Sequence, residues 1–192
     1  MIRISILSLF NERRPLRSRS FCLMFNIFFG GIKLETTIRR ACAKDTEKIM
    51  LLLSEVLELH AKIRPDIFIS GRTKYTEDEL KNIFNNEETP VFVACDENDA
   101  VVGYIFCQFR KRPFSTSMKD FKTLFIDDLC IDENCRGAHI GSRLFEFAKR
   151  FAKENGCYDV TLNVWEGNDS AMAFYRKMGM FVKETQMEII LD

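Results

Sequence analysis

Two spacings of apolar residues recur along the chain after residue 34. A period near 3.6, typical of helices with one packed face, predicts helices over residues 45–61, 76–84, 140–155 and 168–178. Alternation, or a short apolar run between turn residues, predicts strands over residues 34–40, 90–95, 101–109, 121–131, 158–164 and 180–191. The element order β-α-α-β-β-β-α-β-α-β predicts one mixed α/β domain over residues 35–192, in which residues 121–164 form a parallel crossover.

Capping residues support these helix boundaries. Asp45 is suited to cap the first helix, and Thr76 followed three residues later by Glu79 matches the capping-box pattern of the second. Gly156 and Gly179 follow the last two helices, where glycine often terminates a helix. The caps and the apolar periods therefore predict similar boundaries.

The first 34 residues differ in composition from the rest. A basic, serine-containing stretch at 13–19 precedes an apolar and aromatic run at 21–32. The run is shorter than the ~20 residues that span a bilayer; it resembles a secretory signal, but no small-x-small cleavage site follows it. We favour the interpretation that residues 1–34 are an N-terminal extension, either disordered or the product of a mis-assigned start, since Met24 offers a later start.

Charge and cysteine content narrow the function classes. Lys plus Arg and Asp plus Glu each total 28, so the net charge is zero, which argues against a general nucleic-acid binder. The 7 cysteines form no CxxC pair and lie mostly in apolar runs, and the chain has only 2 histidines. This content predicts a reducing, cytoplasmic compartment and no metal site. Neither a nucleic acid nor a membrane is expected as a partner.

The turn before the third helix is suited to bind phosphate. Gly137 and Ala138 leave the main chain accessible to a ligand, and the helix that begins at Ile140 presents N–H groups with partial positive charge. Helix starts of this kind bind phosphate groups readily. From the residues alone, this segment is predicted to be a phosphate-binding loop.

Two motifs resemble a known family. Residues 136–141, Arg-Gly-Ala-His-Ile-Gly, resemble the phosphate loop of the GNAT superfamily of acetyl-CoA-dependent N-acetyltransferases, Arg/Gln-x-x-Gly-x-Gly/Ala. Residues 168–180 resemble the second signature of the family, Asn-x-x-Ala-x-x-Phe/Leu-Tyr-x-x-x-Gly-Phe, and the element order over residues 35–192 matches as well. The chain departs from the pattern at His139, where the family has glycine. The main-chain N–H remains there, but a positive φ would cost a non-glycine residue about 1–2 kcal/mol.

The resemblance implies a fold and a cofactor cleft. The fold would be a central mixed sheet of six to seven strands with helices on both faces, in which the parallel strands 121–131 and 158–164 splay apart. Acetyl-CoA would lie in that cleft as co-substrate, and the N–H of Leu129 would polarise the acetyl carbonyl. The implied cofactor-binding residues are Leu129, Cys130, Ile131, Arg136, Gly137, Ala138, His139, Ile140, Gly141, Ser142, Asn168, Ala171 and Tyr175.

Acetyl transfer to an amine benefits from a base, because an amine with a pKa near 10.4 is only about one part in a thousand neutral at physiological pH. Asp127 and Asp128 precede Leu129, and paired carboxylates tend to raise one pKa. The pair also resembles a Glu-Asp pair in the polyamine branch of the family. Alternatively, one Asp solvates the strand end or pairs with Arg112 or Lys122. Glu166 is the reserve candidate for the base.

Tyr175 is the predicted acid. In the family, a tyrosine at this position hydrogen-bonds the sulfur of coenzyme A and protonates the departing thiolate. A thiol with a pKa near 8.5 is already a fair leaving group, so the expected contribution is modest. The alternative is a core tyrosine on the apolar stripe of a helix.

These observations predict an N-acetyltransferase acting by direct attack in a ternary complex. The expected acceptor is a small primary amine or polyamine-like molecule, with a protein or peptide amine second. A non-catalytic module that senses acyl-CoA is the alternative from another class. The segments 60–75 and 111–119 are expected to set acceptor specificity. Members of the family often dimerise, so a homodimer is possible by analogy.

Overall fold

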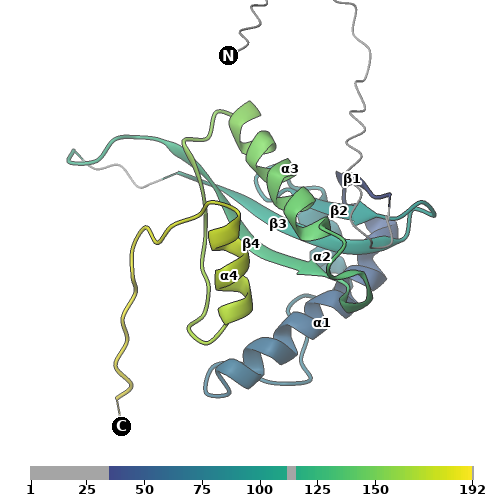
Figure 1. Cartoon of the computed structure of the whole chain (residues 1–192), viewed down its shortest axis with the longest axis horizontal. Coiled ribbons are helices and arrows are strands. Elements are labelled where there is room, and N and C mark those ends of the chain that lie inside the picture. Colours follow the sequence, from purple (N-terminus) through teal and green to yellow (C-terminus); the bar gives the residue numbers. More distant parts are fainter. Residues whose placement is uncertain (1–34, 112–115, 192) are drawn as a thin grey trace, which may run out of the picture. The chain divides into compact units, whose positions relative to one another are not determined.

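Five strands form one mixed sheet in the order β1-β2-β3-β4-β5 (Figure 1). The computed structural model describes residues 35–111 and 116–191, and the sheet lies within them. The strands are β1 (Thr37–Arg40), β2 (Val91–Cys95), β3 (Val101–Lys111), β4 (Lys122–Ile131) and β5 (Asp159–Leu162). The first four pair antiparallel and β5 pairs parallel with β4, which confirms the predicted mixed sheet.

Helices cover both faces of the sheet (Figure 1). They are α1 (Thr46–Ile63), α2 (Glu77–Phe84), α3 (Ile140–Glu154) and α4 (Asp169–Lys177), with 3-10 turns at Ala43–Asp45 and Glu133–Cys135. One core joins α1 and α2 to Tyr104 and Phe106 of β3, and the other joins α3 and α4 to Ile105 and Cys107. Because alternate residues of a strand point to opposite faces, β3 supplies both cores.

The C-terminal segment 180–191 contains no strand, so the strand predicted there is wrong, and the described sheet has five strands rather than six to seven. A strand needs a backbone partner, which alternation in the sequence cannot guarantee. The segment is held instead through side chains, for example by an ion pair of 2.6 Å between Lys183 and Asp159. Several of its apolar side chains are largely exposed: Phe181, Val182, Met187, Ile189, Ile190 and Leu191.

The two predicted N-caps have different outcomes. Thr76 and Glu79 form the capping box: the Thr76 hydroxyl accepts from the Glu79 N–H at 3.3 Å, and the Glu79 carboxylate accepts from the Thr76 N–H at 2.7 Å. Asp45 stands at the N-cap of α1 but makes no side-chain cap, so that prediction is wrong. Its carboxylate accepts instead from the Cys42 N–H and from the Arg39 guanidinium, at 2.8–2.9 Å. A charged bidentate partner from β1 outcompetes the helix N–H groups.

Neither a membrane-spanning helix nor a metal-binding cluster occurs in the described part of the chain. Over residues 35–111 and 116–191, no helix combines the length and apolar character needed to cross a bilayer. The same residues contain no group of three or more His, Cys, Asp and Glu side chains that could hold a metal ion. The predictions for residues 1–34 lie outside the described residues.

Candidate active site

β4 and β5 separate part of the way along the sheet. Their parallel ladder ends at the pair Ile126–Leu162, and β4 continues through Ile131 without a β5 partner among the described residues. The main-chain groups of residues 127–131 on this side are therefore not used by the sheet and can pair with a ligand. The splayed parallel pair expected from the resemblance is confirmed, and the predicted cofactor edge at Leu129 lies along it.

A β-bulge interrupts the ladder between β3 and β4. Phe106 pairs with Asp128 and Cys107 pairs with Ile126, which leaves Asp127 as the extra residue of β4. Bulges re-aim side chains and often occur beside active sites. Here the bulge falls within the predicted carboxylate pair.

The bulge also changes which face of the sheet each β4 residue meets. Two apolar residues before the bulge, Leu124 and Ile126, pack into the core under α3, and so do two after it, Leu129 and Ile131. In a regular strand, residues an odd number of positions apart, such as Ile126 and Leu129, would point to opposite faces of the sheet. Asp128 lies on the opposite face, where it lines a pocket beside α1. The extra residue, Asp127, therefore turns the Asp128 carboxylate toward the pocket while the apolar residues stay in the core.

Both carboxylates contact an ammonium group from the loop between α1 and α2. Lys74 Nζ lies 2.9 Å from Asp127 Oδ2 and 3.8 Å from Asp128 Oδ2. The Asp127 side chain is 38% exposed and that of Asp128 is 10% exposed. The ion pair foreseen as an alternative exists, but its described partner is Lys74. Lys122 instead places its ammonium over the Phe109 ring, and Arg112 lies outside the described residues.

Asp128 has the environment of a general base. Burial raises the pKa of its carboxyl to about 6, and the negative charge of Asp127 acts in the same direction. The Lys74 ammonium opposes this rise, as do the Tyr104 hydroxyl and the Leu129 N–H to a smaller extent. A carboxylate with a pKa near 6 is ionised at neutral pH and is more basic than an ordinary Asp. Of the two predicted carboxylates, Asp128 is better suited to accept a proton.

Tyr104 is a member of this cluster that the sequence did not single out. Its side chain is fully buried, and its hydroxyl makes no hydrogen bond of normal geometry within the described chain. Burial raises the pKa of Tyr104 well above its ordinary value, and the charge of Asp128 adds to that rise. In the sequence, Tyr104 is one aromatic residue in an apolar strand, so nothing distinguishes it from a core position.

Tyr175 reaches the same region from α4. Its ring packs against Phe145 and Phe174, with ring centroids 5.9 Å and 5.1 Å away. Burial raises the pKa of the Tyr175 hydroxyl, and the Asp128 charge raises it further. The hydroxyl therefore stays protonated at neutral pH.

The loop between β4 and α3 has the backbone geometry of an anion site. Gly137 has φ +84°, and His139, at the N-cap of α3, has φ +59° and ψ +15°. The backbone at residue 139 is thus left-handed although the residue is a histidine and not the family's glycine. The first turn of α3 carries no acidic side chain, so its partial positive charge is not neutralised locally. Arg136 Nε donates to the Ile131 carbonyl at 3.4 Å and ties the loop to the end of β4.

α4 packs against this loop. A Cβ placed on Gly141 would lie 3.5 Å from the Phe174 ring, an ordinary contact distance. The Asn168 side-chain oxygen accepts from the Ala171 N–H at 3.2 Å and caps α4, as its position in the sequence predicts. The structure thus brings together the predicted residues of the β4 edge, the loop and α4.

Relief of the left-handed backbone at residue 139 is expected to stabilise the protein. Replacing His139 by Gly removes a strain of about 1–2 kcal/mol but adds about 0.5–1 kcal/mol of unfolded-state entropy, so the free energy of unfolding should rise by up to about 1.5 kcal/mol. Chemical denaturation with urea measures this change. His139→Ala is the matched control, because it removes the imidazole and keeps the strain. A stability gain in the control equal to that of the glycine variant would contradict the explanation.

A pocket of about 320 Å³ adjoins Asp128 on the α1 side of the sheet. Its lining residues are Leu53, Val56, Leu57, His60, Ile67, Phe68, Ile69, Arg72, Thr73, Lys74 and Asp128. The walls are mostly apolar, with one carboxylate and its lysine at one end. The pocket includes much of the predicted specificity segment 60–75, whereas the reserve base Glu166 is exposed and does not line it.

Aromatic residues continue this pocket toward the segment that follows β5. The ring of Phe68 lies 5.1 Å from that of His60 and meets Trp165 edge-on at 5.4 Å. The Arg64 guanidinium lies 5.6 Å from the Trp165 ring, and Arg64 also pairs with Asp66 at 2.6 Å. Burial lowers the pKa of His60, as does the nearby charge of Lys74.

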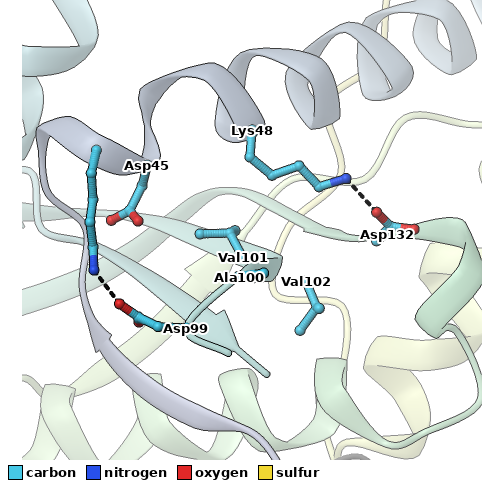
Figure 2. A pocket seen from close by; sticks show the side chains of 8 residues that line it. Asp45, Lys48, Asp99, Ala100, Val101, Val102 and Asp132 are labelled. Atoms are coloured by element: carbon cyan, nitrogen blue, oxygen red, sulfur yellow. Dashed lines mark hydrogen bonds and ion pairs between the residues drawn. The ribbon is translucent and has the colours of Figure 1, made fainter. Parts of the chain in front are cut away.

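A second pocket, of about 450 Å³, lies between α1 and the β2–β3 turn (Figure 2). Its two lysines are paired with carboxylates: Lys48 with Asp132 at 2.5 Å, and Lys44 with Asp99. The pocket contains none of the predicted site residues, and its charges already neutralise one another. Size alone therefore does not mark it as the active site.

The curated relatives of this chain include proteins named as N-acetyltransferases. An uncharacterised N-acetyltransferase of Methanocaldococcus jannaschii is 28% identical over 134 residues, which cover 69% of this chain and 58% of that relative. The peptidyl-lysine N-acetyltransferase YjaB of Escherichia coli is 33% identical over 115 residues, which cover 60% of this chain and 65% of YjaB. The matches thus span less than two thirds of these curated relatives.

A solved structure resembles the whole described domain. The crystal structure of a mutant of the BH1408 protein from Bacillus halodurans aligns with this chain at a TM-score of 0.77 and 33% sequence identity. The alignment covers 81% of this chain and 99% of the BH1408 chain. The model of the acetyltransferase (GNAT) family matches residues 53–180, which include the bulge, the loop and α4. The chain belongs to the GNAT family of acetyltransferases.

Proposed function

We propose that the chain transfers an acetyl group from acetyl-CoA to a primary amine by direct attack in a ternary complex. The observation that carries this proposal is Asp128, a largely buried carboxylate with a raised pKa, where the open β4 edge meets an apolar pocket. A base at the junction of a donor cleft and an acceptor pocket is what acetyl transfer to an amine requires. Residues 35–192 would form the acetyltransferase domain.

The described residues fit acetyl-CoA as donor. The main-chain edge at 129–131 would hold the pantetheine arm, and the N–H groups of residues 136–142 at the start of α3 would hold the pyrophosphate. Bound there, the donor supplies a thioester whose carbonyl the Leu129 N–H would polarise. Leu129 directly follows Asp128 in β4, so the proposed oxyanion donor and the proposed base are neighbours.

In this reaction Asp128 accepts a proton from the acceptor ammonium, directly or through a water molecule. The neutral amine attacks the carbonyl carbon, and Tyr175 donates a proton to the departing sulfur. Asp127, which is more exposed, provides charge that keeps the pKa of Asp128 high and attracts a cationic acceptor.

The acceptor is proposed to be a small primary amine with an apolar or polyamine-like body. The pocket offers mostly apolar walls and the Asp128 carboxylate, and Asp127 contacts the same lysine beside it, which suits an alkylammonium group. A protein lysine is the second candidate. It is favoured by one observation: the side chain of Lys74, itself an alkylammonium, already reaches the carboxylate pair.

A coenzyme A release assay over a panel of amines tests the proposal. The panel should contain spermidine, putrescine, simple alkylamines and lysine-containing peptides. Turnover on any of them supports the enzyme, and the ranking selects the acceptor class. Binding of acetyl-CoA with no turnover on any amine would contradict catalysis and favour the acyl-CoA sensor.

Removing the Tyr175 hydroxyl should have a modest effect. Tyr175→Phe keeps the ring contacts with Phe145 and Phe174 but leaves the thiolate to take its proton from water. Because the thiolate is already a fair leaving group, kcat should fall by about tenfold, below the 10²–10⁴ typical of acid–base catalysis. Steady-state kinetics at saturating acetyl-CoA measure the change. An unchanged kcat would assign Tyr175 to the core alone.

A further inference from the structure

Lys74 occupies the place that the proposed function gives to the acceptor amine. It lies outside helices and strands, in the connection between α1 and α2, and lines the pocket together with Asp128. Its Nζ is 2.9 Å from Asp127 and 3.8 Å from Asp128. The side chain is 37% exposed, so the amine is neither sealed in the core nor fully solvated. The chain thus presents one of its own primary amines to its proposed base.

We propose that Lys74 is an acetylation site of the enzyme itself, modified in cis by acetyl-CoA bound at the β4 edge. This inference rests on the proposed function, because it uses the same donor cleft and the same base. Its basis is geometric: a primary amine within a few ångströms of a general base needs only a carbonyl carbon in reach to become a nucleophile. The open edge that would hold the acetyl group begins at the bulge that places these carboxylates.

The step balances with the groups present and the donor. The Lys74 ammonium gives one proton to the Asp128 carboxylate, and the neutral nitrogen attacks the acetyl carbonyl carbon. The carbon–nitrogen bond forms, the carbon–sulfur bond breaks, and the electron pair leaves on sulfur. The nitrogen loses a second proton as the amide forms. One of the two protons ends on the thiol and the other is released to solvent.

Modification would change the pocket. Acetyl-lysine is neutral, so it cannot form the ion pairs that now hold Lys74 at the two carboxylates. Asp127 and Asp128 would then lose the ammonium that now pairs with both of them, which favours an external ammonium. Lys74 would be the first acceptor, and its acetylation would leave the carboxylates available to external amines.

A second lysine provides a matched control within the same chain. Lys48 is also 37% exposed, and its Nζ also contacts a carboxylate, that of Asp132 at 2.5 Å. It lines the other pocket, which contains neither Asp127 nor Asp128 (Figure 2). Chemical acetylation by free acetyl-CoA should label the two lysines alike, whereas acetylation by the site should select Lys74.

The experiment incubates the purified full chain with acetyl-CoA and no added amine, and then measures acetylation of each lysine by peptide mass spectrometry. The expected result is that Lys74 is labelled at least about tenfold faster than Lys48, at a fractional rate that does not depend on protein concentration. Asp128→Asn should bring the ratio of the two rates close to one. Lys74→Arg should remove the label while keeping a cation at the carboxylates. Circular dichroism checks that each variant is folded.

The outcomes separate this inference from the proposed function. Equal labelling of Lys74 and Lys48, or labelling that Asp128→Asn does not slow, overturns self-acetylation. Turnover on external amines together with an unlabelled Lys74 also overturns it, but leaves the proposed function standing. If neither Lys74 nor any amine of the panel is acetylated although acetyl-CoA binds, the proposed function itself fails. A labelling rate that rises with protein concentration would point to transfer between molecules and contradict the cis reaction.

Discussion

Asp128→Asn is expected to lower kcat/KM for the acceptor by about 10²–10⁴-fold and, at neutral pH, to make the protein more stable. The loss of activity follows because the amide cannot accept a proton, whereas the near-isosteric shape keeps the pocket. Few single changes in this chain should affect activity and stability so strongly in opposite directions.

The gain in stability follows from the pKa. In the folded protein the Asp128 carboxyl has a pKa of about 6, against an ordinary value of 3.8, so the folded state binds this proton more tightly than the unfolded state. The free energy of unfolding therefore falls as the pH rises from about 4 to 6, and the full penalty, at most about 3 kcal/mol, is present above pH 6. Asn carries no such penalty. The variant should be more stable at pH 7.5 and nearly equal to the parent at pH 4.

Asp127→Asn is the matched control for this prediction. Asp127 is more exposed, and its charge raises the pKa of Asp128. Its removal should keep activity within about tenfold and move the acidic limb of the kcat/KM profile to lower pH. Steady-state kinetics between pH 5 and 9, with urea denaturation at both ends, measure the set. If Asp127→Asn abolishes activity and Asp128→Asn does not, the roles of the two carboxylates are reversed.

Ser142→Asp should weaken acetyl-CoA binding by about 10–100-fold while leaving the helix at least as stable. Ser142 is the third residue of α3, whose first turn carries no acidic side chain. A carboxylate there interacts favourably with the helix dipole, by about 0.3–1 kcal/mol, but it repels a pyrophosphate bound at the same N–H groups. Two like charges about 4–5 Å apart near a protein surface repel each other by several kcal/mol before screening. If about 1.4–2.8 kcal/mol of this repulsion remains after screening, the affinity for acetyl-CoA falls by the expected 10–100-fold.

Ser142→Asn is the control here, because it has nearly the same size without the charge. The KM and the dissociation constant for acetyl-CoA, measured at low and high salt, should rise strongly in the Asp variant only, and the difference should shrink at high salt. An Asp variant that binds acetyl-CoA as tightly as the parent would mean that the pyrophosphate does not lie at the start of α3.

The sequence predicted local features well, because they depend on neighbouring residues. The helical periods and the Thr76 capping box are each decided within a few positions. The residue types of the two motifs also identify the family. Local chemistry of this kind is visible in a single chain.

Features that depend on distant residues could not be predicted. Lys74 lies 53 positions from Asp127, and no spacing rule connects them. The Asp45 carboxylate pairs with Arg39 of β1 instead of capping the helix N–H groups beside it. The C-terminal segment has the alternating pattern of a strand, but no strand of the described sheet pairs with it. The bulge was foreseeable in part: the apolar positions of β4 shift from even to odd numbers between Ile126 and Leu129, which signals an extra residue.

The early end of the β4–β5 ladder links folding to the supply of donor. A ligand that pairs with the open edge binds the folded chain and not the unfolded one, so it shifts the folding equilibrium by mass action. At a concentration 100 times its dissociation constant, the shift amounts to about 2.7 kcal/mol. The thermal midpoint and the protease resistance of the protein would therefore rise with the concentration of acetyl-CoA. In a cell depleted of acetyl-CoA, the folded enzyme would be less stable.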